Sequence, residues 1–186
     1  MKKIPTLFER DWNDDRSRVV NQVHQGCEWV LNGEGVATRK YDGSCCLIRG
    51  GRLFKRRELK SGDVPPENFE MADFDHETNK TVGWIPVGDG PEDRYHREAL
   101  ANTMPAPDGT YELLGPKVQG NAEHRAQFCL QSHGAAETFP DVPRAFDELS
   151  RWLIGKDIEG LVFRHHDGRM AKIKLRDFGH KRKSST

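Results

Sequence analysis

The amino-acid sequence predicts an α+β domain built on antiparallel β-sheets, with a few flanking helices. Short apolar segments separated by glycine-containing turns recur along the chain, and one segment has clear helical periodicity. Strands that are joined by tight turns pair in the antiparallel sense, so this pattern favours antiparallel sheets. The chain has 186 residues, which is enough for one domain with a hydrophobic core.

The first predicted element is a β-hairpin within residues 34–59. Two apolar-rich runs, Ser44–Arg49 and Arg52–Lys55, flank Gly50 and Gly51. Two adjacent glycines tolerate the positive φ angles of the tight turns that join twisted strands.

Residues 61–109 are predicted to form a long loop or an insertion. This segment is polar and rich in Gly, Pro and Asp. Within it, Gly83–Val87 is the one run that suggests a short strand.

Two strands and a helix are expected next. Thr110–Leu114 and Gln127–Gln131 have the composition of strands. Residues 141–153 are predicted to be helical, because Asp141 can cap the first turn and Pro143 fits it. The helix would end at Gly155 and bury an apolar stripe made of Phe146, Leu149, Trp152 and Leu153.

A final hairpin is predicted from Ile158–Phe163 and Arg169–Leu175, joined through Asp167-Gly168. A loop of two or four residues would place several side chains on one face, because side chains alternate along a strand, whereas a three-residue loop would break this parity. That face would carry a carboxylate, two lysines and apolar side chains. The alternative is a solvated face with exposed lysines. The residues concerned are Glu159, Leu161, Phe163, Lys172 and Lys174.

Charge and hydropathy restrict the possible functions. Lys plus Arg and Asp plus Glu both number 29, so the zero net charge gives no general support for a nucleic-acid partner, and a basic surface would have to be local. The sequence contains no run of about 18 apolar residues, so no membrane span is predicted. Residues 1–5 lack the apolar segment of a secretory signal, so we expect a cytoplasmic protein. The cysteines lack C-x-x-C spacing, which argues against zinc and for reduced thiols: Cys27, Cys45, Cys46 and Cys129.

Four short motifs carry the functional prediction. Lys40-Tyr41-Asp42-Gly43 is followed by Tyr111-Glu112-Leu113-Leu114-Gly115, then Glu159-Gly160-Leu161-Val162-Phe163, then Lys172-Ile173-Lys174. In this order they resemble the motifs of covalent nucleotidyltransferases, which include ATP-dependent RNA and DNA ligases and mRNA capping enzymes. The continuation Ser44-Cys45-Cys46 is most similar to the small ATP-dependent RNA ligases. The resemblance implies a nucleotidyltransferase domain of the ATP-grasp-like ligase type.

By this resemblance, Lys40 is the nucleophile that attacks the α-phosphorus of ATP and becomes lysyl-AMP. Neutralising an ordinary lysine at pH 7 costs about 4–5 kcal/mol, and nearby cations reduce that cost. Lys172, Lys174 and a divalent metal are the candidate cations, and the two lysines would also stabilise the transition state. Asp42 would orient Lys40, although a turn-stabilising role before Gly43 is its alternative.

The resemblance also assigns residues to the metal and the ribose. Glu159 matches the carboxylate that binds Mg²⁺ or Mn²⁺, for which oxygen ligands are suited. Glu112 matches the glutamate that contacts the ribose and can also assist the metal. Arg56, with Arg57 as the alternative, matches an arginine near the ribose or phosphates.

Adenine is expected near Thr38, which stands two residues before Lys40, and against Leu161. DNA ligases often have glutamate at the position of Thr38, and they and capping enzymes usually have arginine at the position of Cys45. Only 12 residues follow Lys174, so no OB-fold domain is expected. These departures favour an RNA ligase over a DNA ligase or a capping enzyme.

We therefore expect residues 1–186 to form a single adenylyltransferase domain that uses ATP to join 5′-phosphate and 3′-hydroxyl RNA ends, as in RNA repair. Nicked or structured RNA would be the partner, and the protein would be a monomer. The alternatives are a DNA nick ligase or guanylyltransferase of the same superfamily, and a non-catalytic nucleotide- or RNA-binding module. The eight histidines are expected to be structural or exposed.

Overall fold

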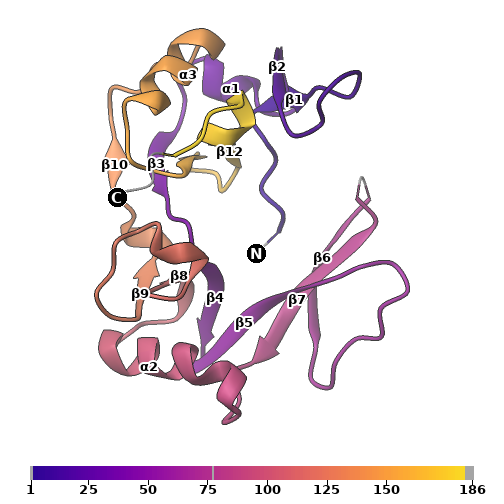
Figure 1. Cartoon of the computed structure of the whole chain (residues 1–186). Helices are drawn as coiled ribbons and strands as arrows, with labels where there is room; N and C mark the ends of the chain where they lie inside the picture. The colour runs from indigo at the N-terminus through magenta and orange to yellow at the C-terminus, as the bar shows by residue number, and fades with distance from the viewer. Residues whose placement is uncertain (1, 77, 183–186) are drawn as a thin grey trace. The chain divides into compact units, whose positions relative to one another are not determined.

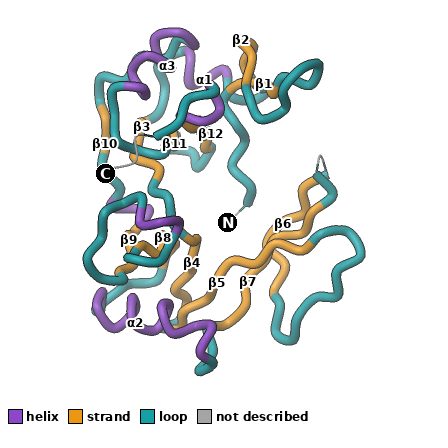
Figure 2. The backbone as a smooth tube through the Cα atoms, viewed as in Figure 1, coloured by secondary structure: helices purple, strands orange, loops and turns teal. Residues whose placement is uncertain are grey.

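The computed structural model describes residues 2–76 and 78–182, and its fold is mixed α+β (Figure 1). Strands and loops make up most of the chain (Figure 2), and the sheet pairings in the described part are antiparallel apart from one isolated bridge. The predicted class of antiparallel sheets with few helices is therefore confirmed. None of the described helices is both long enough and apolar enough to span a lipid bilayer.

The chain divides into two compact units. Unit 1 consists of the N-terminal residues up to Lys3 together with Asp42–Ala135, and unit 2 consists of Ile4–Tyr41 together with the chain from Ala136 onward. The boundary at residues 41 and 42 divides the Lys40–Gly43 motif, so its lysine belongs to unit 2 and its aspartate to unit 1. That residues 1–186 act as a single domain stays a prediction.

Unit 1 contains a six-stranded antiparallel sheet in the order β6-β7-β5-β4-β8-β9. Its strands are β4 (Ser44–Arg49), β5 (Arg52–Leu59), β6 (Glu70–Asp75), β7 (Lys80–Pro86), β8 (Gly109–Leu114) and β9 (Cys129–Ser132). Its remaining elements are η1 (Pro91–Asp93), α2 (Arg94–Thr103), η2 (Gln119–Asn121) and η3 (His133–Ala135). A core that includes Cys46, Ile48, Tyr111 and Leu130 lies beneath one face of the sheet.

The predicted hairpin turn at Gly50 and Gly51 is confirmed. Arg49 pairs with Arg52, and the two glycines have φ angles of 57° and 70°. Both angles lie in the left-handed region, where a side chain would be strained. The hairpin is narrower than residues 34–59, however, because residues 36–40 form β3 in unit 2.

The prediction of a long loop over residues 61–109 is wrong, because the segment contains β6, β7, η1 and α2. Gly and Pro in the connections obscure a helical signal: Tyr95 and Ala99 are four residues apart and therefore lie on one helix face. Ala99 is fully buried, and the ring of Tyr95 stacks on Phe128 with centroids 4.3 Å apart. Packing against the sheet stabilises a helix whose local sequence is largely polar.

Unit 2 contains a four-stranded antiparallel sheet in the order β10-β3-β11-β12 and a two-stranded sheet, β1-β2. Its strands are β1 (Phe8–Arg10), β2 (Val19–Val23), β3 (Val36–Lys40), β10 (Thr138–Phe139), β11 (Gly160–Arg164) and β12 (Met170–Lys174). Its helices are α1 (Glu28–Leu31), α3 (Phe146–Ile154) and η4 (Leu175–Phe178). Leu149 and Leu153 of α3 are fully buried in the core beneath the larger sheet.

The β11–β12 hairpin does not have the predicted parity. His165 N donates to the carbonyl of Arg169, which leaves three loop residues, 166–168, and Gly168 has a φ angle of 93°. A three-residue loop with glycine in the left-handed region is a common hairpin type. Leu161 consequently pairs with Ile173, and Lys174 pairs with Gly160. The predicted common face is therefore wrong.

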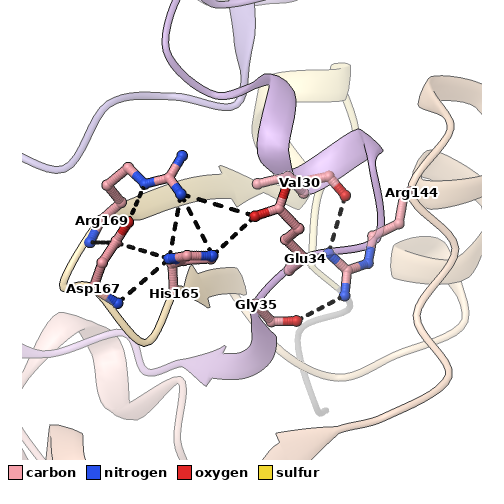
Figure 3. Close-up of polar contacts among 7 residues, drawn as sticks. All are labelled: Val30, Glu34, Gly35, Arg144, His165, Asp167 and Arg169. Carbon is pink, nitrogen blue, oxygen red and sulfur yellow. Dashed lines mark hydrogen bonds and ion pairs between the residues drawn. The ribbon is translucent and has the colours of Figure 1, made fainter.

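Helix α3 begins at Phe146, later than the predicted start at Asp141. The preceding segment is held in an extended course by Arg144, whose guanidinium donates to the carbonyl oxygens of Val30, Glu34 and Gly35 at 3.1, 2.8 and 3.0 Å (Figure 3). These bonds tie the segment before α3 to α1 and to the loop between α1 and β3. The predicted end of the helix at Gly155 is confirmed.

A second polar cluster fastens the turn of the β11–β12 hairpin to the same loop (Figure 3). The buried imidazole of His165 lies 3.0 Å from Glu34 Oε2 and 2.8 Å from Asp167 Oδ1. Arg169 pairs with Asp167 and lies over the ring of Trp29. The hydrogen bonds to Arg169 and His165 hold the pKa of the Asp167 carboxyl far below its usual value. His165 thus has the structural role expected of the histidines.

Candidate functional site

The carboxylate of Glu159 lies between two lysine side chains in unit 2. Lys40 is the last residue of β3 and pairs with Gly160 of β11, which in turn pairs with Lys174 of β12. Lys40 Nζ lies 2.5 Å from Glu159 Oε2, and Lys174 Nζ lies 2.6 Å from Glu159 Oε1. The three side chains are 22%, 15% and 11% exposed for Lys40, Lys174 and Glu159, respectively. The structure thus brings three of the predicted residues together.

Charge determines the ionisation of this cluster. Burial raises the pKa of Glu159, but the ammonium groups of Lys40 and Lys174 outweigh that effect and hold the pKa below its ordinary value. Glu159 is therefore ionised at neutral pH. Two cations share one carboxylate, so the cluster carries excess positive charge where a phosphate could bind.

The backbone of β12 is fixed on both sides of its lysines. The buried carboxylate of Asp177 accepts a hydrogen bond from Lys174 N at 2.9 Å and pairs with Arg10 at 2.9 Å. Lys172 N donates to the carbonyl of Pro5 at 2.9 Å. These contacts set the direction from which each lysine side chain leaves the sheet.

One face of the four-stranded sheet carries all three lysines. Lys40 and Thr38 alternate along β3, and Thr38 pairs with Val162, which pairs with Lys172. Because side chains alternate, these residues and Lys174 project from the same face. Lys172 therefore belongs to the same cationic surface as Lys40 and Lys174.

Leu161 does not belong to this surface. It is fully buried in the unit 2 core with Phe163, on the opposite face of β11. The expectation that Leu161 contacts adenine is therefore wrong, because the three-residue turn reverses the assumed parity. Val162 is the apolar residue of β11 that lies on the face of the lysines.

Thr38 is buried and uses its hydroxyl within the sheet. Its Oγ1 donates to the carbonyl of Val162 at 2.8 Å and accepts from Arg164 Nε at 3.3 Å. Arg164 also lies 3.4 Å from the sulfur of Met170, and burial lowers the pKa of its guanidinium. This face thus adds a fourth cationic side chain, which sequence reasoning did not identify.

Packing explains the glycines of two motifs. A Cβ on Gly160 would meet the carbonyl oxygen of Ile173 and would lie 2.7 Å from Lys174 Cα. A Cβ on Gly43 would meet the carbonyl oxygen of Leu113 and would lie 2.8 Å from Glu112 Cγ. Glycine at these positions lets the backbone lie close to the strands that carry Lys174 and Glu112.

In unit 1, Glu112 and Arg56 lie on the same face of the sheet. Glu112 pairs with Cys45, and the pairing of Cys46 with Lys55 brings Cys45 opposite Arg56. Burial raises the pKa of the Cys45 thiol to about 11; Glu112 raises it further, and Arg56 opposes the effect through its charge and a hydrogen bond. Both charged residues therefore flank one thiol.

This register distinguishes the two arginines. Arg57 follows Arg56 on β5, is exposed, and projects from the other face of the strand. One strand separates Arg56 from Glu112, so their Cα atoms are about 10 Å apart. The preference for Arg56 over Arg57 as the partner of Glu112 follows from the alternation of side chains.

Asp42 is half-buried at the start of unit 1. Its backbone N–H donates to Oε1 of the buried Glu123 at 3.1 Å. This bond fixes the chain between Lys40 and β4. The structure thus gives Asp42 a defined backbone position, whereas its proposed effect on Lys40 stays a prediction.

His133 is a residue of this face that sequence reasoning missed. Its Nε2 lies 3.0 Å from Glu112 Oε2, and the two side chains are 14% and 11% exposed. It follows Ser132, the last residue of β9, which pairs with Tyr111. The proximity of His133 to Glu112 can be inferred only once the register between β8 and β9 is known.

A divalent cation is compatible with Glu159 by the chemistry of the donor. Mg²⁺ takes oxygen ligands and commonly uses one or two carboxylates, with waters and phosphate oxygens completing its shell. Within residues 2–76 and 78–182, no three His, Cys, Asp or Glu side chains are grouped so as to hold a metal ion. The residues thus suit a metal bound jointly with a phosphate rather than an all-protein metal site.

Comparison with known proteins does not assign the chain to a family. No protein-family model matches the sequence, and no curated protein matches it.

Proposed function

We propose that this chain is an ATP-dependent RNA ligase that acts in the cytoplasm through a lysyl-AMP intermediate. The observation that carries the proposal is the cluster of Lys40, Glu159 and Lys174, with contacts of 2.5 and 2.6 Å to one carboxylate. An amine nucleophile, a carboxylate and a second cation at adjacent sheet positions are the groups that phosphoryl transfer to a lysine requires.

In the first step, Lys40 loses a proton to solvent and its Nζ attacks the α-phosphorus of ATP. The new P–N bond forms as the bond to the bridging oxygen breaks, and pyrophosphate leaves. Lys174 and Lys172 would stabilise the negative charge that develops on the α-phosphate. Bound Mg²⁺ or Mn²⁺ would be held by Glu159 and would neutralise phosphate charge.

Two further steps would join the RNA ends. A 5′-phosphate oxygen of RNA attacks the phosphorus of lysyl-AMP, the P–N bond breaks, and Lys40 regains its proton. The 3′-hydroxyl of the other end then loses its proton to solvent and attacks the 5′-phosphorus, a phosphodiester forms, and the bond to AMP breaks so that AMP leaves. The choice of RNA rests on the similarity of Lys40–Cys46 to small RNA ligases.

Nucleoside recognition would come from the face of unit 1 that carries Glu112 and Arg56. A carboxylate accepts hydrogen bonds from ribose hydroxyls, and a guanidinium donates to phosphate or hydroxyl oxygens. Thr38 would lie near adenine, with Val162 in place of Leu161 as the apolar contact.

The test is incubation of the protein with α-labelled ATP and Mg²⁺ or Mn²⁺. We expect acid-labile label on the wild-type chain and none on Lys40→Ala. Lys55→Ala is the matched control, because Lys55 forms a similar ion pair with Asp93 at 2.6 Å but is not part of the cluster. Absence of label on the wild type with either metal would refute the proposal.

The substrate is tested with nicked RNA duplexes, nicked stem-loops and free single strands, with matched DNA duplexes and with GTP in place of ATP. We expect ATP-dependent sealing of RNA held by base pairing, because a chain of 186 residues offers little surface to grip two free ends. Equal sealing of all three RNA substrates would refute the preference for paired ends. Preferential sealing of DNA, or labelling by GTP alone, would assign another activity of the superfamily.

A further inference from the structure

Glu112 is a buried carboxylate with an unusual set of contacts. It lies on β8, between β4 and the edge strand β9 of the unit 1 sheet. Among the described residues, its one hydrogen bond or ion pair is with His133, at 3.0 Å between Nε2 and Oε2. A buried ionised carboxylate normally has several donors, because burial removes the water that would otherwise solvate it. Oε1 accepts no hydrogen bond from the described part of the chain and is not among its fully buried unpartnered atoms, so this oxygen is accessible to a ligand.

The contacts of His133 match this arrangement. A carboxylate oxygen only accepts, so Nε2 of His133 carries the proton and donates to Glu112. The opposite ring nitrogen, Nδ1, is buried and has no hydrogen-bond partner among residues 2–76 and 78–182. The interaction with Glu112 is consequently the polar contact that orients the ring. Loss of that contact would leave the largely buried ring of His133 without a hydrogen-bond partner among the described residues.

We propose that His133 is a positioning residue that holds Glu112 so that its second oxygen can accept hydrogen bonds from the ribose hydroxyls of ATP. The inference rests on the proposed function and adds to it a residue that none of the four sequence motifs contains. The imidazole fixes one carboxylate oxygen, and the rotation that would turn the other oxygen away from the ligand is thereby prevented. Arg56 on the same sheet face supplies a cation toward the same ligand.

The effect should appear in the recognition of the ribose rather than in the chemistry at phosphorus. A hydroxyl that donates to a charged acceptor contributes enough to change affinity about tenfold or more. We expect the wild type to prefer ATP over 2′-deoxy-ATP or 3′-deoxy-ATP by about tenfold in kcat/KM for lysyl-AMP formation. His133→Ala should reduce that preference to less than about threefold, mainly by raising KM for ATP.

The experiment measures lysyl-AMP formation with ATP and both deoxy analogues on wild type, His133→Ala, His133→Gln and Glu112→Gln. Glutamine can place its amide nitrogen near the position of Nε2, so His133→Gln should restore much of the preference. Because His133 acts through Glu112, adding His133→Ala to Glu112→Gln should change the preference no further. His96→Ala is the control, since His96 is a largely buried histidine of unit 1 beside Asp93.

The outcomes separate the inference from the proposed function. If the wild type forms lysyl-AMP but His133→Ala keeps its preference for ATP, the positioning role is refuted and the ligase proposal stands. An equal loss of preference for ATP in His96→Ala and His133→Ala would also refute the positioning role, because a general loss of structure would then explain both results. No lysyl-AMP on the wild type with Mg²⁺ or Mn²⁺ overturns both. If His133→Ala does not fold, as judged by circular dichroism, the comparison of His133→Gln with Glu112→Gln decides.

Discussion

The coupling between Lys40 and Glu159 can be measured without any assumption about function. We expect Glu159→Gln to lower the free energy of unfolding, because it leaves the ammonium groups of Lys40 and Lys174 near each other without the charge that neutralises them. Breaking a buried ion pair costs about 3–5 kcal/mol, whereas an exposed pair contributes about 0.2–1 kcal/mol. The lysine side chains are 22% and 15% exposed, so an intermediate loss of about 2–4 kcal/mol is expected.

A double-mutant cycle isolates the pair. Lys40→Met leaves Glu159 paired with Lys174, so its cost should be smaller, about 0.5–1.5 kcal/mol. The double variant loses the Lys40–Glu159 ion pair once, whereas the sum of the two single variants counts that loss twice. The cost of the double variant should therefore be smaller than that sum by a coupling of about 1–2 kcal/mol. Urea denaturation followed by far-ultraviolet circular dichroism measures all four unfolding free energies.

A coupling below about 0.5 kcal/mol would refute the reasoning, because additivity within that range is typical of residues that do not interact. The pair of Lys80 and Glu58, at 2.6 Å but with side chains 36% and 52% exposed, is the matched control. Its coupling should be below about 1 kcal/mol and should decrease with added salt.

Further predictions concern pH, packing and recognition. The pKa of Glu159 is lowered in the folded state, so the ionised carboxylate stabilises the fold at pH values above the ordinary pKa of 4.5. This contribution is lost as the pH falls below 4.5 toward the lowered pKa. In that pH window the urea midpoint of the wild type should therefore fall more steeply than the urea midpoint of Glu159→Gln. Arg144→Ala should destabilise the fold by about 2–4 kcal/mol in the same assay, because three carbonyl oxygens lose a shared donor, and an equal loss in Arg144→Lys would contradict the role of the planar guanidinium. Leu161→Ala should cost about 2–5 kcal/mol, as for other fully buried leucines, and a stability within about 1 kcal/mol of the wild type would contradict its place in the core. If the proposed function holds, Arg56→Ala should raise KM for ATP about tenfold and Arg57→Ala less than about threefold, measured by lysyl-AMP formation; similar values for both would contradict the assigned face.

Local sequence was sufficient where a local conformation determines the structure. The turn at Gly50 and Gly51 was predictable because the required φ angles favour glycine. The strand at Thr110–Leu114 was predictable because Thr110 and Tyr111 are residue types that favour strands. The cluster of Lys40, Glu159 and Lys174 was predictable as a set of residues, because their order and chemical types form a recognisable pattern.

Long-range register was not predictable, and most errors follow from it. The predicted common face of the last hairpin requires an even number of loop residues before Arg169, whereas the hydrogen bond from His165 to Arg169 leaves three. A change of one residue in the loop length exchanges the faces on which the side chains of a strand lie. Leu161 therefore lies in the core and not on the face of the proposed site. The pairing of Glu112 with His133 was missed for the same reason, since it depends on how β8 and β9 align.

The sequence by itself determined the residue types of the proposed chemistry: a lysine, a carboxylate and paired lysines in a fixed order. It also determined the tight turns, because their backbone conformations act over only a few residues. The tertiary structure decided which of these side chains share a face, that Lys40 and Lys174 lie on either side of Glu159, and that His133 contacts Glu112. The physical reason is that strand pairing joins residues far apart in the chain, and its register depends on the burial of whole faces rather than on any local preference.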